Sequence, residues 1–203
     1  MKTLVVTGGI GSGKSLVCSH LEKKGIPVYD SDSRTRRIYD LYPALIGEVE
    51  QEFGRTFRLA DGGLDRKALA AEVFSDRRKL AALENLVYPY VLDDFLGWRA
   101  SFDEDAVPYV VFESAVFLEK PFFHHIADKV LFVACPESVR LERAMARDRA
   151  TADEIRGRMD AQHLDPALAD VVIENDSDIK TLFEKTDHVV GTIWDNKTNK
   201  KQS

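Results

Sequence analysis

The chain has little of what marks secreted, membrane-spanning or nucleic-acid-coating proteins. It has two cysteines, Cys18 and Cys135, each in an apolar stretch, so reduced buried thiols are expected rather than a disulfide framework. No apolar run approaches the ~18 residues of a membrane-spanning helix. With 28 basic and 34 acidic residues the net charge is −6, which argues against binding nucleic acid through a broad basic surface. We expect a cytoplasmic protein with neither a membrane nor a nucleic acid as partner.

One motif stands out in the sequence. Residues Gly8–Ser15, GGIGSGKS, fit the phosphate-binding pattern G-x-x-x-x-G-K-[ST]. The β-branched apolar run Thr3–Thr7 before it is typical of a buried parallel strand, and Ser15–Lys24 after it is typical of a helix that ends at Gly25. Glycines allow backbone N–H groups to converge on phosphate oxygens, and a helix N-terminus adds positive potential. The sequence therefore predicts a P-loop that binds a nucleoside triphosphate.

Two residues of this loop carry further chemistry. Lys14 can neutralise charge on the β- and γ-phosphates, and the Ser15 hydroxyl can bind Mg²⁺. A dinucleotide-binding or protein-kinase glycine loop would need a glycine where Lys14 stands. The candidate nucleotide-binding residues of the loop are Gly9, Ile10, Gly11, Ser12, Gly13, Lys14, Ser15 and Leu16.

Short apolar runs separated by helical segments indicate the fold class. With the first run they predict an α/β protein with a five-stranded parallel sheet flanked by helices, as in P-loop nucleoside and nucleotide kinases. Ligands of such sheets bind beyond the carboxyl ends of the strands. The other runs are Pro27–Tyr29, Tyr109–Phe112, Lys129–Ala134 and Val171–Ile173.

Two intervals are too long for simple crossovers, so we expect insertions. Residues 34–105 are predicted to be a helical substrate-binding insertion and residues 144–163 a short helical lid, which begins its helix at a Thr151–Glu154 capping box. The nucleotide-binding core then comprises residues 1–33, 106–143 and 164–195, and residues 196–203 form a disordered tail.

The insertion is expected to hold several helices. Ile46, Val49 and Phe53 mark one apolar stripe. Leu69, Val73 and Phe74 mark a second stripe after the cap Asp65, Ser75 is expected to cap a third helix, and a last one runs from Pro89 to about Trp98.

Carboxylates after the second and third strands are candidates for proton transfer and for metal binding. Asp30 and Asp32 alternate and would face the same way on an extended segment, so one could accept a hydroxyl proton while the other supports Mg²⁺ or an arginine. The alternative is a solvated or helix-capping pair. Glu113 resembles a Walker B acid near Mg²⁺, or is simply an acidic residue in a loop.

Three arginines, Arg140, Arg143 and Arg147, recur at spacings of three and four and share one helix face. Guanidinium groups there could close over phosphates and stabilise transition-state charge. The alternative is a solvated face paired with neighbouring acids, namely Glu137, Glu142 and Asp148.

In their order and spacing these motifs resemble the dephospho-coenzyme A kinase family over nearly the whole chain. Beyond the loop, the resemblance rests on Val28–Asp32 with Arg36, Leu64–Arg66, Leu83–Pro89, Arg143–Asp148, Arg158–Gln162 and Asp170–Asn175. It implies ATP- and Mg²⁺-dependent phosphorylation of the ribose 3′-hydroxyl of dephospho-coenzyme A, the last step of coenzyme A synthesis.

The resemblance also implies roles for residues. It makes Asp32 the general base and Arg140, Arg143 and Arg147 candidates for lid contacts. With Lys14 of the loop, our candidate catalytic residues are then Asp32, Arg140 and Arg143, and Arg147 and Asn175 join the nucleotide-binding set. There are departures: Tyr88 replaces a usual histidine, and Glu113 stands where aspartate is common. A longer acid could still reach Mg²⁺ through water, so Ser15 and Glu113 are the candidate metal ligands.

Alternatives within and outside this class stay open. Another small P-loop kinase could act on a nucleoside, a nucleotide or a small alcohol. A nucleotide-binding switch would need an N-K-x-D motif for guanine, and Asn196–Asn199 lacks the aspartate. The oligomeric state is open, with a monomer favoured.

Overall fold

The computed structural model describes residues 1–74 and 76–195, which form two compact units. Residues 1–29 and the chain from Asp103 onward form the first unit, and Asp30–Phe102 form the second. The predicted disordered tail, 196–203, and the predicted cap Ser75 lie outside the described residues.

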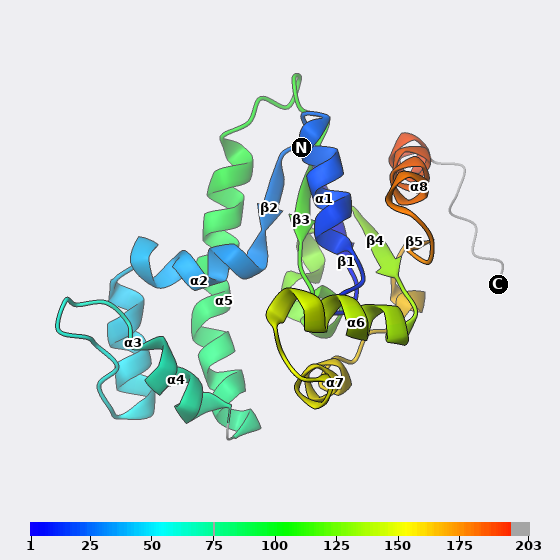
Figure 1. The fold of residues 1–203 in the computed structure, drawn as a ribbon. Coiled ribbons are helices and arrows are strands. Elements are labelled where there is room, and N and C mark those ends of the chain that lie inside the picture. The colour runs from blue at the N-terminus through cyan, green and yellow to red at the C-terminus, as the bar shows by residue number, and fades with distance from the viewer. Residues whose placement is uncertain (75, 196–203) are drawn as a thin grey trace. The chain divides into compact units, whose positions relative to one another are not determined.

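The first unit is built on a five-stranded, all-parallel sheet in the order β2-β3-β1-β4-β5 (Figure 1). Each predicted apolar run forms a strand, so the predicted fold class is confirmed. The strands are β1 (Lys2–Thr7), β2 (Val28–Asp30), β3 (Tyr109–Glu113), β4 (Lys129–Ala134) and β5 (Val171–Glu174). β1 is the middle strand, so the segment that follows it leaves from the centre of the sheet.

Helices α1 (Lys14–Lys23) and α8 (Ile179–Thr192) pack on the same face of this sheet. Their apolar stripes supply Val17, Leu21 and Leu182 to a cluster with strand residues such as Leu4 and Leu131, all of them almost fully buried. Burial of a leucine or valine side chain contributes about 1.5–3 kcal/mol. This cluster anchors the helix that follows the glycine loop.

The other segments of the unit follow β3, β4 and α6. Two short 3₁₀ helices, η1 (Phe117–Glu119) and η2 (Pro121–Ile126), place Phe117 and Phe123 against Phe112 of β3. After β4 come α6 (Glu137–Asp148), α7 (Ala152–Asp160) and η3 (Pro166–Leu168). The predicted capping box is present: the Thr151 hydroxyl accepts from the Glu154 N–H, and the Glu154 carboxylate accepts from the Thr151 N–H.

The second unit is helical, with α2 (Ser31–Leu41), α3 (Ala44–Phe53), α4 (Arg66–Val73) and α5 (Arg77–Ala100). Asp65 caps α4 through the Ala68 N–H. The prediction of a separate helix from Pro89 was wrong, because α5 runs through it. Proline removes one hydrogen bond to the preceding turn, and the apolar face around Val87, Val91 and Phe95 continues across it.

Two predictions about burial also fail. Phe74, expected on an apolar stripe, has 75% of its surface exposed, because α4 ends at Val73 and Phe74 only caps it. Both cysteines are reduced, as expected, but Cys135 is only half-buried because it follows the end of β4. Among the described residues, no helix is long and apolar enough to cross a membrane.

Candidate functional site

The glycine loop between β1 and α1 has a conformation that needs its glycines. Gly11 and Gly13 have positive φ angles, +76° and +99°. A Cβ on Gly11 would lie 2.3 Å from the Arg140 carbonyl oxygen, and one on Gly13 would lie 2.2 Å from Nδ2 of Asn175. A side chain at either position would be strained and would clash, so both positions need glycine. Bare backbone is what allows amide groups to approach phosphate oxygens.

Lys14, the first residue of α1, folds back over this loop. Its Nζ donates to the Gly9 carbonyl oxygen at 3.3 Å, and the side chain is buried. An ammonium group on a flexible stem can exchange such a carbonyl for a phosphate oxygen.

The two predicted metal ligands lie together. The Ser15 hydroxyl donates to Oε1 of Glu113 at 2.8 Å, across 98 residues of sequence. The parallel pairing of β1 with β3 explains this contact, since Glu113 ends β3 in register with Val6, just before the loop. The pair offers hydroxyl and carboxylate oxygens, the donor type that Mg²⁺ prefers. No group of three or more His, Cys, Asp or Glu residues in the described chain could hold a metal ion.

Asn175, predicted to bind the nucleotide, makes a hydrogen bond to the backbone of the glycine loop. Its Nδ2 donates to the Ser12 carbonyl oxygen at 2.8 Å, and its backbone N–H donates to the Ala134 carbonyl oxygen at 2.8 Å. The residue is 2% exposed. Because an unsatisfied buried polar group costs about 1–3 kcal/mol, this bond fixes the loop to the end of β5.

Gln162, two residues after α7, was given no site role from sequence. Its Oε1 accepts from the Ile10 N–H at 2.9 Å, and its Nε2 donates to the Ala115 carbonyl oxygen at 3.5 Å. The only sequence signal was its place in the R-x-x-x-Q segment, Arg158–Gln162. Gln162 thus contacts both the glycine loop and the segment after β3.

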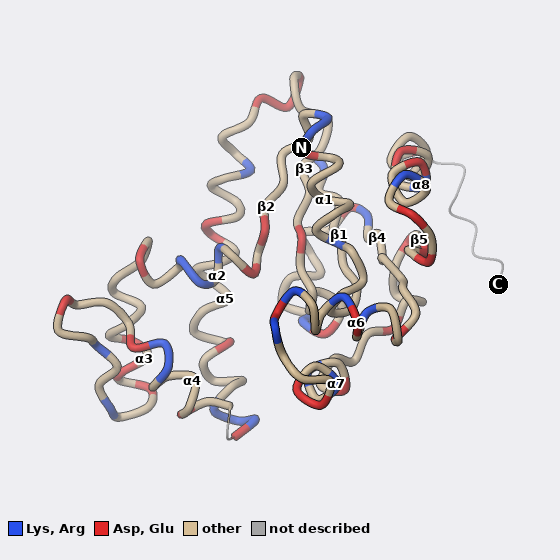
Figure 2. Tube along the Cα trace, in the orientation of Figure 1, with Lys and Arg blue, Asp and Glu red and all other residues tan. Residues whose placement is uncertain are grey.

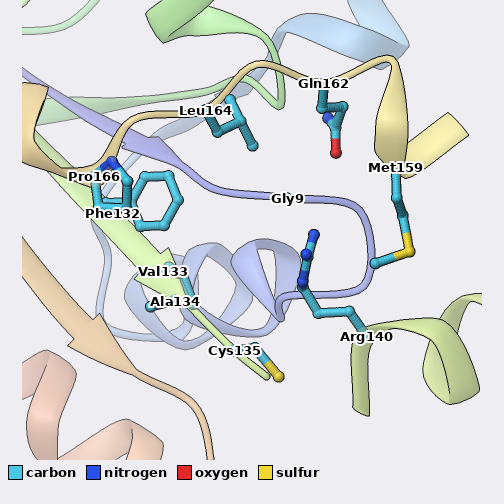
Figure 3. A pocket seen from close by; sticks show the side chains of 10 residues that line it. All are labelled: Gly9, Phe132, Val133, Ala134, Cys135, Arg140, Met159, Gln162, Leu164 and Pro166. Atoms are coloured by element: carbon cyan, nitrogen blue, oxygen red, sulfur yellow. The ribbon is translucent and has the colours of Figure 1, made fainter. Parts of the chain in front are cut away.

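The three arginines of α6 lie near the loop in different ways. Arg140 has its guanidinium against Gly9 and lines a cavity of about 280 Å³ with Met159 and Gln162 (Figure 3). Arg143 and Arg147 line a second cavity, of about 380 Å³. The rest of that lining comes from the loop and α1: Gly11, Gly13, Lys14, Ser15 and Leu16. The structure therefore places two predicted arginines beside the predicted nucleotide-binding residues.

The arginines nevertheless have partners within their own region. Arg147 donates two hydrogen bonds to Asp148, at 2.6 and 3.0 Å, and Arg158 donates to the same carboxylate at 2.7 Å. These bonds hold the pKa of Asp148 well below its usual range. Arg143 contacts the sulfur of Cys135 at 3.6 Å, and burial raises the pKa of that thiol while Arg143 and Arg140 oppose the rise. Figure 2 shows the basic residues of α6 with acidic residues close by.

The two aspartates after β2 do not form the predicted extended pair. Asp30 is the N-cap of α2, and its carboxylate accepts from the backbone N–H and the hydroxyl of Ser33, at 3.0 and 2.5 Å. Asp32 stands in the first turn of that helix. The helix begins at Ser31, so the period of two that would align the carboxylates is absent. Asp32 belongs to the second unit, and its role as general base stays a prediction.

The comparison with known families decides the classification. The family model described as dephospho-CoA kinase (CoaE) matches residues 3–181. The chain belongs to the dephospho-CoA kinase family. The resemblance inferred from the motifs is therefore confirmed, and with it the predicted class of kinase.

Relatives in this family cover most of the chain. A dephospho-CoA kinase of Porphyromonas gingivalis is 39% identical over 169 residues, which are 83% of this chain and 81% of the relative. The crystal structure of TT1252 from Thermus thermophilus superposes with a TM-score of 0.78 at 31% identity, over 94% and 96% of the two chains. The dephospho-CoA kinase of Campylobacter jejuni, at 22% identity, has the same fold, with a TM-score of 0.68 over 95% and 98%.

Proposed function

We propose that this protein transfers the γ-phosphoryl group of ATP to the ribose 3′-hydroxyl of dephospho-coenzyme A, giving coenzyme A and ADP. The observation that carries the proposal is the P-loop with Ser15 and Glu113 in contact at its end, in a chain of this family. We place the reaction in the cytoplasm and expect a monomer, and both statements stay predictions.

The glycine loop and α1 bind ATP, the phosphate donor. Backbone N–H groups between Gly9 and Leu16, apart from the Ile10 N–H that Gln162 holds, surround the phosphates, and Lys14 leaves the Gly9 carbonyl for a phosphate oxygen. Ser15 and Glu113 would hold Mg²⁺, the carboxylate directly or through water, since both present oxygen atoms at one point. When bound, Mg²⁺ neutralises charge on the transferring group.

The arginines act on the charge that develops during transfer. Arg143 and Arg147 line a cavity with Lys14 and Ser15, and Arg140 approaches the start of the loop. Guanidinium groups suit phosphate because they donate two parallel hydrogen bonds. We assign Arg140 and Arg143 to transition-state charge and Arg147 to ATP, and for this Arg147 must give up Asp148.

The acceptor is assigned to the helical insertion, residues 34–105, with Asp32 as the base that accepts the proton of the 3′-hydroxyl. The proton moves to the carboxylate as the hydroxyl oxygen attacks the γ-phosphorus and the bond to the β-phosphate oxygen breaks. Lid residues 144–163 would exclude water while this happens.

A coupled assay of ADP formation tests the acceptor. We expect turnover with dephospho-coenzyme A and Mg²⁺, and no more than background with adenosine, AMP, shikimate or pantothenate. Equal turnover across the panel would favour a general small-molecule kinase. ADP formation without any acceptor would favour a nucleotide-hydrolysing switch, and either result would overturn the proposal.

A further inference from the structure

The end of the α7 region holds the glycine loop at Ile10 in two ways. The Ile10 side chain packs against the small apolar cluster of Ala144, Ile155 and Met159, which joins α6 to α7. The Ile10 N–H donates to Oε1 of Gln162 at 2.9 Å. Both contacts come from the segment predicted to be a lid, so they connect the first half of the loop to this segment.

The same glutamine also reaches the segment that follows β3. Its Nε2 donates to the carbonyl oxygen of Ala115 at 3.5 Å, and Ala115 lies two residues after Glu113. One amide therefore joins the loop that surrounds phosphate to the strand end that carries the carboxylate. At the far end of the loop, the hydrogen bond from Ser15 to Glu113 makes the matching connection.

These two connections differ in what happens when Mg²⁺ and ATP bind. In the proposed function Ser15 and Glu113 would both hold Mg²⁺, so the ion would alter their direct bond. The bonds of Gln162 involve only main-chain N–H and C=O groups, which carry no charge and take no part in the transfer. The tether through Gln162 can therefore persist in the loaded state.

We infer that Gln162 is a positioning residue, which holds Ile10 and Ala115 so that the loop amides and Glu113 keep the spacing needed for magnesium-bound ATP. The amide is suited to this because it donates from one end and accepts at the other. The inference rests on the proposed function in taking the loop to bind ATP and Glu113 to hold Mg²⁺, and it needs no particular acceptor.

Two substitutions separate the bonds. Gln162→Glu has nearly the same shape, keeps an acceptor for the Ile10 N–H and loses the donor to Ala115. Gln162→Met is close in length and loses both bonds. Gln51 is exposed on helix α3 of the other unit, so Gln51→Glu and Gln51→Met are matched controls for the same chemical changes.

The experiment measures the dissociation constant of ATP with Mg²⁺ by calorimetry, without acceptor, for all four variants. We expect Gln162→Met to weaken binding about tenfold and Gln162→Glu about threefold, because a single neutral hydrogen bond is worth about that much. The Gln51 variants should match the parent protein. Binding that stays unchanged in Gln162→Met would overturn the inference.

Amide hydrogen exchange by NMR separates positioning from a general loss of stability. Exchange at the Ile10 N–H should quicken in Gln162→Met and stay near the parent rate in Gln162→Glu, with the core amides of β1 unchanged in both. Equal rates at Ile10 in both variants would contradict the role. If Gln162→Met fails to fold, Gln162→Asn takes its place, since it keeps the amide but shortens the side chain so that it cannot reach both Ile10 and Ala115. We then expect weaker ATP binding, and parent-like binding would contradict the inference. A protein that binds ATP as expected but phosphorylates none of the acceptors would refute the proposed function and leave this inference standing.

Discussion

The glycine loop and the arginine helix α6 both face the proposed phosphate site, yet they are held in different ways. The loop is held by groups that are distant in the sequence, namely the buried Asn175 amide at Ser12 and the half-buried Gln162 amide at Ile10. Arg143 and Arg147 instead have partners on or next to their own helix: Arg143 contacts the Cys135 thiol, and Arg147 binds the partly exposed Asp148 carboxylate. The difference suggests a loop already shaped for phosphate and arginines that exchange partners when the nucleotide arrives.

The largest effect should come from removing the Lys14 charge next to the glycine loop. Lys14→Met leaves the loop backbone intact and removes the ammonium group beside Gly9. We expect turnover to fall about 10²- to 10³-fold, the cost of losing one electrostatic contact in a phosphoryl-transfer site. Lys23→Met, exposed at the end of the same helix, is the control in the ADP assay. A loss below tenfold would mean that the loop does not hold the transferred phosphate.

A second variant changes Asp32, which lies in neither the glycine loop nor helix α6. Asp32→Asn should keep ATP affinity and reduce turnover by about 10²-fold, if Asp32 is the base. Asp30→Asn is the matched comparison, because asparagine also caps helices well and Asp30 already caps α2. Steady-state kinetics and ATP calorimetry on both variants check this, and a larger loss in Asp30→Asn would transfer the role to Asp30.

A third variant tests the arginines of α6, which exchange partners in this account. Arg143→Ala should lower turnover by roughly tenfold to 10²-fold with a smaller change in ATP affinity, because the guanidinium acts most strongly on charge that develops in the transition state. Arg156→Ala, exposed on α7, is the control. Equal losses in kcat and in ATP affinity would show Arg143 to be a ground-state binding group.

Asn175→Leu tests the buried contact that holds the glycine loop at Ser12. The substitution leaves the Ser12 carbonyl without its buried donor, at a cost of about 1–3 kcal/mol. ATP affinity should fall about tenfold with a lower melting temperature. Asn175→Asp also removes the amide donor and places a buried carboxylate against the Ser12 carbonyl oxygen, so it should lose at least as much in both measurements. Full ATP affinity in either variant would show that the loop keeps its shape without this contact.

The smallest effect concerns the ion pairs of Asp148. Its pKa in the folded protein lies below the reference value of 3.8, so its contribution to stability is present above that value and is lost as the pH falls through the folded pKa. Asp148→Asn should lower stability by about 1 kcal/mol or less, since the pair is partly exposed. Melting curves from pH 7 to pH 5 should show a constant gap from the parent protein, and the gap should close only under strong acid.

Asp153→Asn is the matched control for this variant, because its carboxylate is 97% exposed and pairs with Arg156 at 3.7 Å. We expect no measurable shift in its melting temperature. A gap for Asp148→Asn that already closes near neutral pH would contradict the assigned ion pairs.

The sequence was informative where structure depends on near neighbours. The β-branched run, the glycine loop and the capping box are each set by a few adjacent residues, and all three were predicted. The contacts of Asn175 with Ser12 and of Gln162 with Ile10 span 163 and 152 residues. Contacts of that kind depend on which strands become neighbours, so a motif can mark the residue without revealing what it touches.

Some patterns admitted two readings that only the fold could separate. Alternating Asp30 and Asp32 suit an extended pair, yet the same composition favours a helix N-terminus, and the helix formed. Pro89 suits the first turn of a helix as well as a continuous helix that gives up one bond. The arginine spacing correctly placed three side chains on α6, but not the carboxylate and thiol that bind them.

The transfer of labelled phosphate tests the central claim most directly. The protein is mixed with ATP labelled at the γ-phosphate, Mg²⁺ and dephospho-coenzyme A, and the products are separated. We expect the label in coenzyme A, on the ribose 3′-oxygen, in amounts equal to the ADP formed. Label found in inorganic phosphate, at a rate that does not depend on dephospho-coenzyme A, would contradict the account.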